Sequence, residues 1–316
     1  MSHKIVSVQP IKPEHEQQIR SIAPDWEFVN GQTKEDWLPH LQEAEIVIGW
    51  KSEVGQLLNP GTGLRWVQNW GAGVDKFPLA AFGTAGVKLT STSGIHPYPI
   101  SEHVIAMMLS FTRKIHLSLL NQQRRKWQNV GPLGEMHGKT VGIIGVGAIG
   151  TEIARLSKAF GMKVLGVKRT VAPVEHVDHM FTLAQLDEVL QESDYVVVTL
   201  PLTKDTTHIF GRGQFQAMKR DAFFINIGRG GTTDTKALID ALREGEIAGA
   251  GLDVFEVEPL PEDHPLWEME NVMITPHNSG SSGHYDERAM QIFTENLRYY
   301  IEGKPLRNLI DLQNEY

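Results

Sequence analysis

The 316-residue sequence contains no cysteine, which excludes disulfides, thiolate zinc sites and thiol nucleophiles and leaves the redox compartment open. No run approaches the roughly 18 apolar residues of a membrane-spanning helix, and the N-terminus lacks the long apolar core of a signal peptide. An excess of basic residues is missing too. The formal net charge of −8 argues against broad binding to nucleic acid or anionic membranes. We therefore expect a cytoplasmic protein that binds any anionic ligand through locally placed cations.

The chain is long enough for two domains, and its 41% of hydrophobic residues is ordinary for a globular protein. Up to Thr90, short apolar runs such as KIVSVQP and EIVIGW alternate with helix-like polar segments, which is typical of a small α/β layer. GIHPYPI interrupts this alternation, so we place a boundary near Pro97. We expect the last helical segment to pack back on the first domain, which otherwise lacks cover.

After Gly138 the alternation restarts with apolar, β-branched strands separated by helices of about a dozen residues. The clearest strands are TVGIIG, KVLGVK, YVVVTLP and AFFINIG. Strands that are apolar along their whole length indicate a parallel sheet buried on both faces. The predicted fold class is therefore α/β, with a doubly wound, Rossmann-type sheet in the second domain.

The segment after Pro97 carries more apolar side chains at helical spacing than one packing surface needs. They are Val104, Ile105, Met108, Leu109, Ile115 and Leu119. A core between the domains and an interface between subunits both explain this face, and core packing is the commoner use.

A glycine-rich turn follows the first strand of the second domain. GVGAIG, from Gly145 to Gly150, matches G-x-G-x-x-G and opens an amphipathic helix. There Gly145 makes the tight turn, Gly147 lets a pyrophosphate approach the backbone, and Gly150 lets the helix pack on the strand. The pattern predicts a dinucleotide site, although an ordinary glycine-rich turn would look the same.

The end of the next strand carries bases where an NAD site usually has an acid. About 20 residues past the glycine turn, the chain reads Lys168, Arg169 and Thr170. The two bases can neutralise a 2′-phosphate that a carboxylate would repel, and the hydroxyl can donate a hydrogen bond. We interpret these residues as selecting NADP(H), with NAD(H) still possible. The alternative is a solvated pair of surface charges.

Three charged or titratable residues stand at predicted strand ends of the second domain: Arg229 in INIGRGG, Glu258 in DVFEVEPLP and His277 in ITPHNSG. In an open parallel sheet such ends line one crevice. Reduction of a 2-oxo acid requires a cation for the carboxylate, a proton donor for the carbonyl oxygen and a group that keeps the donor charged. Arginine, histidine and glutamate fit these roles, although each alone would also suit a turn or a cap.

In this order, GVGAIG, the PLT that begins at Pro201, INIGRGG, LDVFEVEPLP and TPHNSG resemble the D-isomer-specific 2-hydroxyacid dehydrogenase family over nearly the whole chain. The resemblance implies two domains. Residues 1–97, completed by 286–316, would form a smaller, flavodoxin-like substrate-binding lid domain. Residues 98–285 would form the Rossmann dinucleotide-binding domain.

The resemblance also implies roles for individual residues. Arg229 would bind the substrate carboxylate and carbonyl, His277 would be the general acid/base, and Glu258 would be its partner. Backbone amides of Ala72 and Gly73, in WGAGVD, would hold the carboxylate. The implied cofactor contacts are Gly145, Gly147, Ala148, Ile149, Gly150, Pro201, Thr206 and Asp253, the last of these at the nicotinamide carboxamide.

The bases at 168 and 169 resemble the NADPH-dependent glyoxylate/hydroxypyruvate reductase branch of this family. We therefore predict hydride transfer from NADPH to a small 2-oxo acid, giving a D-2-hydroxy acid, in a homodimer formed through the helix after Pro97. One alternative is a phosphoglycerate dehydrogenase, although the chain ends soon after its last helix, so we expect no appended regulatory domain. The other is a dinucleotide-sensing, corepressor-like interaction protein. The 2-oxo acid and the physiological direction stay open, and no metal site is expected.

Overall fold

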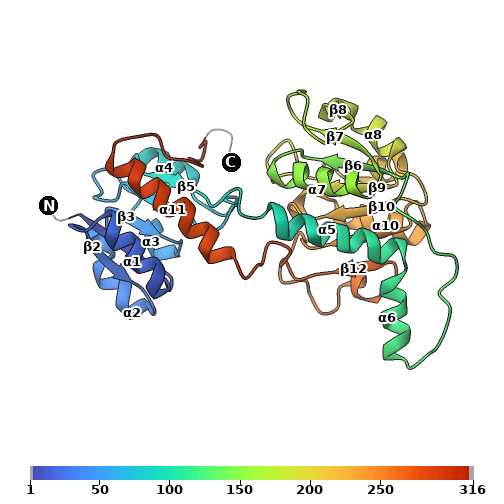
Figure 1. The fold of residues 1–316 in the computed structure, drawn as a ribbon, viewed down its shortest axis with the longest axis horizontal. Helices are drawn as coiled ribbons and strands as arrows, with labels where there is room; N and C mark the ends of the chain where they lie inside the picture. Colours follow the sequence, from blue (N-terminus) through green and yellow to red (C-terminus); the bar gives the residue numbers. More distant parts are fainter. Residues whose placement is uncertain (1–2, 313–316) are drawn as a thin grey trace. The chain divides into compact units, whose positions relative to one another are not determined.

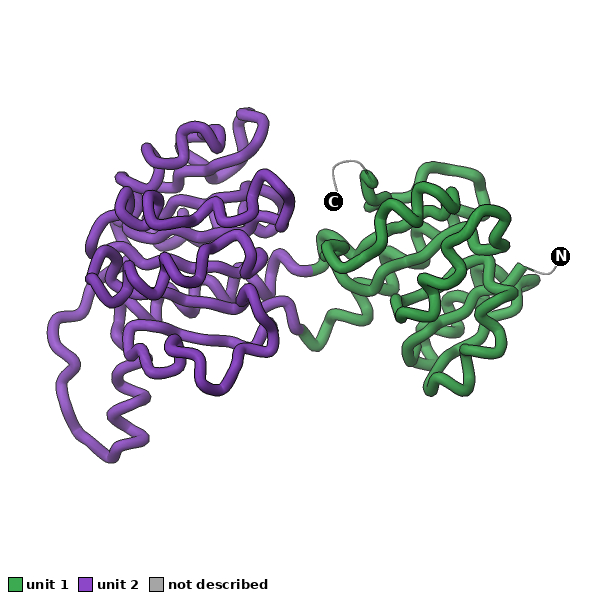
Figure 2. Tube along the Cα trace, turned by 180° about the vertical axis from the view of Figure 1, so that it is seen from behind, with its two compact units in different colours: residues 1–95, 282–316 green, residues 96–281 purple. Residues whose placement is uncertain are grey.

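The computed structural model describes residues 3–312, which divide into two compact units. Unit 1 contains the described parts of residues 1–95 and 282–316, and unit 2 contains residues 96–281 (Figure 2). The chain passes from one unit to the other after Ile95 and again after Ser281. Each unit is an α/β layer built on its own parallel sheet.

Unit 1 has a five-stranded parallel sheet with the strand order β2-β1-β3-β4-β5. This is the order of flavodoxin-like folds. The strands are β1 (Lys4–Ser7), β2 (Glu27–Asn30), β3 (Ile46–Ile48), β4 (Trp66–Gln68) and β5 (Lys88–Thr90). The helices between them are α1 (Pro13–Ile22), α2 (Lys34–Trp37), α3 (Ser52–Gly55) and α4 (Leu79–Ala85), with a 3₁₀ turn at Leu38–Glu43.

Helix α11 (Tyr285–Ile301) belongs to unit 1 although it comes last in the chain (Figure 1). Its Met290, Phe293 and Leu297 are buried in one hydrophobic cluster with Ile5 of β1 and Trp66 of β4. The spacing of three and four residues places these side chains on one helix face, which explains why α11 covers this sheet.

Unit 2 has a seven-stranded parallel sheet with the order β12-β11-β10-β9-β6-β7-β8. Numbered from β6, this is the Rossmann order, so the predicted fold class is confirmed. All carboxyl ends of the strands lie at one edge, where the candidate residues are found. The strands are β6 (Thr140–Ile144), β7 (Lys163–Val167), β8 (His179–Phe181), β9 (Tyr195–Val198), β10 (Phe223–Asn226), β11 (Gly249–Leu252) and β12 (Val272–Ile274).

Helices cover both faces of this sheet. One hydrophobic cluster joins α5 and α7 to it, and a second joins α8, α9 and α10. Their bounds are α5 (Pro97–Thr112), α6 (Ile115–Gln123), α7 (Ala148–Ala159), α8 (Leu186–Glu192), α9 (Arg212–Ala217) and α10 (Thr235–Glu244), with 3₁₀ turns at Leu183–Gln185, Gly230–Thr232 and Pro265–Glu268.

The apolar segment after Pro97 forms two helices rather than the one long helix that its spacing predicts. Helix α5 ends at Thr112 and α6 starts at Ile115, because Lys114 adopts a left-handed conformation with φ of 51°. Four of the six apolar residues pack into the core of unit 2: Val104, Ile105, Met108 and Leu109. The other two, Ile115 and Leu119, are exposed on α6.

Candidate functional site

The glycine turn between β6 and α7 has the backbone that its sequence predicts. Gly145 has φ of +110°, and a Cβ on Gly150 would lie 2.6 Å from the Gly145 carbonyl oxygen. A Cβ on Gly147, by contrast, would meet no atom within 4 Å. Gly145 and Gly150 therefore serve the fold, while the open space at Gly147 fits the close approach of a pyrophosphate.

Helix α7 starts directly after this turn, with Ala148, Ile149 and Gly150 as its first residues. The N–H groups at the start of an α-helix have no acceptor within the helix, and the helix dipole adds partial positive charge there. These donors could hold the phosphates of a dinucleotide.

The three residues after β7 are exposed at the surface of unit 2. The first of them is nevertheless bound through its backbone, because the Lys168 N–H donates to the Phe181 carbonyl of β8 at 3.0 Å. Arg169 and Thr170 follow Lys168 at this strand end. The exposed end of β7 thus presents two cationic side chains and one hydroxyl to a ligand.

The loop after β9 contains Pro201, which is exposed, and Thr206, which is buried. The Thr206 hydroxyl donates to the Pro201 carbonyl at 2.7 Å and accepts from the Thr203 N–H at 2.8 Å. Thr206 therefore stabilises the loop that carries Pro201. The same loop is joined to the segment after β11 by a hydrogen bond of 2.6 Å between His208 Nε2 and Glu256 Oε1.

Arg229 follows β10 and is partly buried. The side chain of Asn226, the last residue of β10, fixes the turn, because its Oδ1 accepts from the Gly228 N–H at 3.0 Å and its Nδ2 donates to the Arg229 carbonyl at 3.2 Å. The Thr232 hydroxyl also donates to the Arg229 carbonyl, at 2.7 Å. The backbone that carries the guanidinium is thus held from both sides.

His277 and Glu258 are brought into contact from the segments that follow β12 and β11. His277 Nδ1 lies 2.8 Å from Glu258 Oε2, and Glu258 Oε1 accepts from the Phe255 N–H at 3.0 Å. An ionised carboxylate only accepts hydrogen bonds, so Nδ1 carries the hydrogen. Within residues 3–312 no group bonds to His277 Nε2, and 48% of the His277 side chain is exposed. Nε2 is therefore the nitrogen available for proton transfer with a ligand.

Asp253 directly follows β11 and is fully buried. Its Oδ1 accepts from the Thr275 hydroxyl at 2.6 Å and the Asn278 N–H at 3.0 Å, and its Oδ2 accepts from the Ser279 N–H at 3.1 Å. Asp253 thus fixes the chain on both sides of His277.

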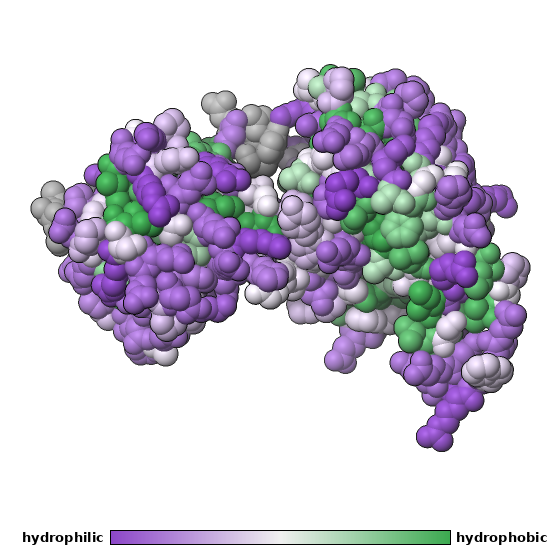
Figure 3. Space-filling model, viewed as in Figure 1, coloured by the Kyte–Doolittle hydropathy of each residue, from purple (hydrophilic) through white to green (hydrophobic). Residues whose placement is uncertain are grey.

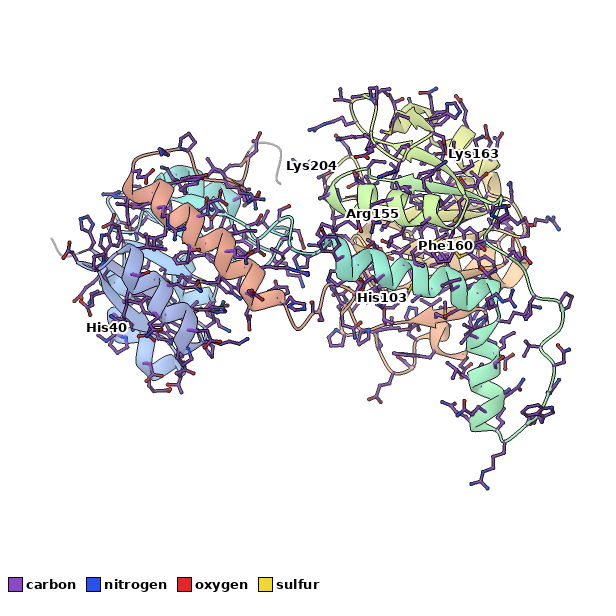
Figure 4. All side chains as sticks on the ribbon, in the orientation of Figure 1. His40, His103, Arg155, Phe160, Lys163 and Lys204 are labelled. Carbon is purple, nitrogen blue, oxygen red and sulfur yellow. The ribbon has the colours of Figure 1, made fainter. Side chains whose placement is uncertain are left out.

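Sequence reasoning missed His103 of α5, which is labelled in Figure 4. Its Nε2 lies 3.1 Å from Thr275 Oγ1. Because the Thr275 hydroxyl donates to Asp253, we assign the hydrogen of this bond to Nε2 of His103. Burial lowers the pKa of His103, against the opposing effect of the Asp253 carboxylate. A histidine within an apolar helical repeat gives no sequence signal that separates this contact from core packing.

In unit 1, Ala72 and Gly73 lie in the loop after β4, which we call loop 69–75. Ala72 is exposed and Gly73 is partly exposed. Asn69, which the sequence pattern did not single out, is buried at the start of the loop and bonds to its backbone.

Two kinds of feature are absent from residues 3–312. No group of three or more His, Asp or Glu side chains that could hold a metal ion occurs in that range. None of its helices is long and apolar enough to cross a membrane.

Comparison with known proteins gives one family match inside unit 2. A family model described as the D-isomer specific 2-hydroxyacid dehydrogenase, NAD binding domain, matches residues 105–279. The matched range contains the glycine turn, the end of β7 and the residues His277, Glu258, Asp253 and Arg229.

Relatives match almost the whole chain. Glyoxylate/hydroxypyruvate reductase B of Escherichia fergusonii is 36% identical over 305 residues, which cover 94% of this chain and 91% of that protein. D-3-phosphoglycerate dehydrogenase of Archaeoglobus fulgidus is 31% identical over 312 residues, which cover 98% of this chain. This chain spans only 59% of the length of that relative.

A solved structure has the same fold over its full length. The NADPH-dependent glyoxylate/hydroxypyruvate reductase from Sinorhizobium meliloti, in complex with NADP and sulfate, superposes with a TM-score of 0.83 at 30% identity. The superposition covers 100% of both chains.

Proposed function

Because the chain belongs to the D-isomer specific 2-hydroxyacid dehydrogenase family of NAD(P)-dependent oxidoreductases, we propose that it reduces a small 2-oxo acid to a D-2-hydroxy acid. The contact between His277 Nδ1 and Glu258 Oε2 carries this proposal. It holds the imidazole in one orientation with Nε2 available, which is what a proton donor for a carbonyl oxygen requires. Glyoxylate and hydroxypyruvate are the substrates that we favour.

Each residue has a definite task in this reaction. His277 Nε2 donates a proton to the carbonyl oxygen as it becomes a hydroxyl, and Glu258 stabilises the imidazolium beforehand. Arg229 binds the substrate carboxylate and carbonyl through its guanidinium, and the backbone N–H groups of Ala72 and Gly73 bind the carboxylate. When bound, a nicotinamide dinucleotide supplies the hydride.

We further propose NADP(H) as the preferred cofactor. Gly145, Gly147 and the first turn of α7 would hold the pyrophosphate, Pro201 would contact the dinucleotide, and Lys168, Arg169 and Thr170 would bind the 2′-phosphate. The NADP in the Sinorhizobium meliloti reductase supports this preference. A contact between Asp253 and the nicotinamide carboxamide stays a prediction. Both carboxylate oxygens of Asp253 already accept hydrogen bonds from the protein, so the carboxamide would have to share them.

The test is the loss of NADPH absorbance, with NADH in parallel, when purified protein meets glyoxylate, hydroxypyruvate, bulkier 2-oxo acids and 3-phosphohydroxypyruvate. We expect turnover of glyoxylate or hydroxypyruvate, faster with NADPH than with NADH. No turnover with any pair would contradict a reductase. Turnover with NADH alone would contradict the role of Lys168 and Arg169.

Phosphoglycerate dehydrogenase activity is the second candidate. The match to the Archaeoglobus fulgidus enzyme over 98% of this chain favours it. The exposed bases after β7 speak against it, because an NAD site usually has an acid there. Turnover that is confined to 3-phosphohydroxypyruvate in the same panel would establish this candidate instead.

We propose that unit 2 forms a homodimer through α5 and α6. A cavity of about 630 Å³ is lined by α5, α6 and β12, and apolar side chains remain exposed around it. Ile115, Leu119 and Trp267 are 43%, 54% and 52% exposed, and hydrophobic residues gather on this side of unit 2 in Figure 3. Light scattering at micromolar concentration is expected to give the dimer mass, and a monomer would contradict this assembly. A cytoplasmic location stays a prediction.

A further inference from the structure

Loop 69–75 is held by the side chain of its own first residue. Asn69 Nδ2 donates to the carbonyl oxygens of Gly71 and Gly73 at 2.9 and 3.0 Å, and Asn69 Oδ1 accepts from the Gly71 N–H at 3.1 Å. One amide group therefore makes three hydrogen bonds to the backbone of the loop. Only an amide can do this from one position, because it carries two donors and an acceptor at the end of a short side chain.

Asn69 is itself rigidly placed by its neighbours in the sheet. Its N–H donates to the Thr90 carbonyl at 2.8 Å, and its carbonyl accepts from Gln68 Nε2 at 2.8 Å. The Thr90 hydroxyl donates to Gln68 Oε1 at 2.9 Å and accepts from Trp66 Nε1 at 2.7 Å. Only 8% of Asn69 is exposed. A satisfied buried network of this kind fixes the orientation of the amide.

The Trp70 carbonyl, which precedes the carbonyls of Gly71 and Gly73 in the loop, is bound as well. Trp70 O accepts from the Tyr285 hydroxyl at 2.6 Å and from the Thr92 hydroxyl at 3.1 Å. The N–H groups of Ala72 and Gly73 are different, because within residues 3–312 no hydrogen bond satisfies them. The carbonyls of Trp70, Gly71 and Gly73 are thus bound within unit 1, while the N–H groups of Ala72 and Gly73 are left for a ligand. Neighbouring backbone donors without acceptors favour an anion.

We propose that Asn69 is a positioning residue for binding of the 2-oxo acid carboxylate. It does not contact the substrate. It holds the carbonyl oxygens of Gly71 and Gly73, so that the N–H groups of Ala72 and Gly73 meet the anion without a repulsive carbonyl beside them. This inference rests on the proposed function, in which loop 69–75 binds the carboxylate.

The test compares Asn69→Ala with Asn30→Ala. Asn30 is a matched control in the same unit, since it also bonds backbone groups, with Nδ2 to the Ile11 carbonyl at 2.7 Å and Oδ1 to the Ile11 N–H at 3.0 Å. For Asn69→Ala we expect the KM of the 2-oxo acid to rise about tenfold or more, with a smaller change in kcat and an unchanged Kd for NADPH. Asn30→Ala is expected to lower the melting temperature with an unchanged KM.

Oxalate binding to the NADPH-loaded protein, measured by calorimetry, separates this inference from the proposed function because it needs no turnover. We expect Asn69→Ala to weaken oxalate binding about tenfold and Asn30→Ala to leave it unchanged. If Asn69→Ala does not fold, Asn69→Ser replaces it, since serine is too short to bond both carbonyls. An oxalate Kd within twofold of wild type overturns the inference, as does equal weakening by Asn30→Ala or a wild type that binds no oxalate. Wild-type oxalate binding without turnover of any 2-oxo acid would contradict the proposed function alone.

Discussion

The two units place different side chains directly after a strand of their sheets, an amide in unit 1 and a carboxylate in unit 2. Asn69 directly follows β4 in unit 1, and Asp253 directly follows β11 in unit 2. The Asn69 amide donates to two carbonyls of loop 69–75, whereas the Asp253 carboxylate accepts from the N–H groups of Asn278 and Ser279. Each side chain fixes a loop at the carboxyl end of a parallel strand. Asn69 binds two carbonyls and one N–H group, whereas Asp253 accepts from donors alone.

This difference decides which groups the loop leaves for a ligand. In unit 1 the bound carbonyls leave backbone N–H groups at Ala72 and Gly73, which suit an anion. In unit 2 the carboxylate consumes backbone N–H groups and leaves the side chain of His277 available. We therefore expect unit 1 to contribute recognition by backbone and unit 2 to contribute proton transfer by a side chain.

The largest effect is expected at His277. His277→Ala removes the proton donor, so kcat should fall about 10²- to 10⁴-fold while the Kd for NADPH is unchanged. Steady-state kinetics and a fluorescence titration with NADPH measure the two quantities. His284→Ala is the control, because His284 is an exposed histidine that pairs with Glu287 at 3.7 Å. Activity near wild type in His277→Ala would show that His277 does not supply the proton.

The next effect is expected at Glu258, for which unit 2 contains a matched control. Glu258→Gln keeps an acceptor for His277 Nδ1 but removes the charge that stabilises the imidazolium, so kcat should fall about 10- to 100-fold. Glu256→Gln changes a similar pair, that with His208 at 2.6 Å, and should leave kcat near wild type. Equal losses in the two variants would assign the effect to loop stability rather than to proton transfer.

A smaller effect on kcat is expected at Thr275, whose hydroxyl donates to Asp253. Thr275→Val removes the hydroxyl that donates to Asp253 and lies 3.1 Å from His103 Nε2, while keeping the shape of the side chain. The loop that carries His277 should shift slightly, which lowers kcat by up to about tenfold. Thr275→Ser restores the hydroxyl and should restore kcat. If the serine variant stays as slow as the valine variant, the hydroxyl does not position His277.

The sequence predicted the parts of this arrangement that depend on local pattern. The α/β class, the glycine turn at Gly145 and the strand ends that carry Glu258 and His277 follow from periodicity and motifs. The residues that hold the loops in place do not follow from such patterns. Asn69 acts through the geometry of its loop. His103 contacts Thr275, which lies 172 positions away in the chain. Strand β8 and the break at Lys114 were missed for a related reason, since a three-residue strand and a single left-handed residue leave no periodic signal.

The smallest effect on activity is expected at Asp194, a carboxylate that stabilises the fold of unit 2 and does not belong to the candidate site. Asp194 accepts from the Thr140 N–H at the start of β6 at 2.7 Å and from Lys219 Nζ at 3.2 Å. Burial raises its pKa, but these bonds and the nearby lysines lower it more, so the pKa lies below its usual range. A carboxyl group of this kind stabilises the fold above its unfolded pKa, and that contribution is lost as the pH falls through the folded pKa.

Asp194→Asn should therefore lower the stability by about 1–3 kcal/mol at pH 7 without a change in the KM of the 2-oxo acid. The difference in melting temperature from wild type should narrow as the pH falls below about 4, where the unfolded carboxyl takes up a proton. It should vanish once the folded carboxyl, whose pKa is lower, is protonated as well. Asp221→Asn, at an exposed position, is the control and should give no such narrowing. A difference that is constant with pH would mean that Asp194 acts through shape rather than charge. A raised KM would mean that Asp194 also affects the candidate site, in addition to stabilising the fold.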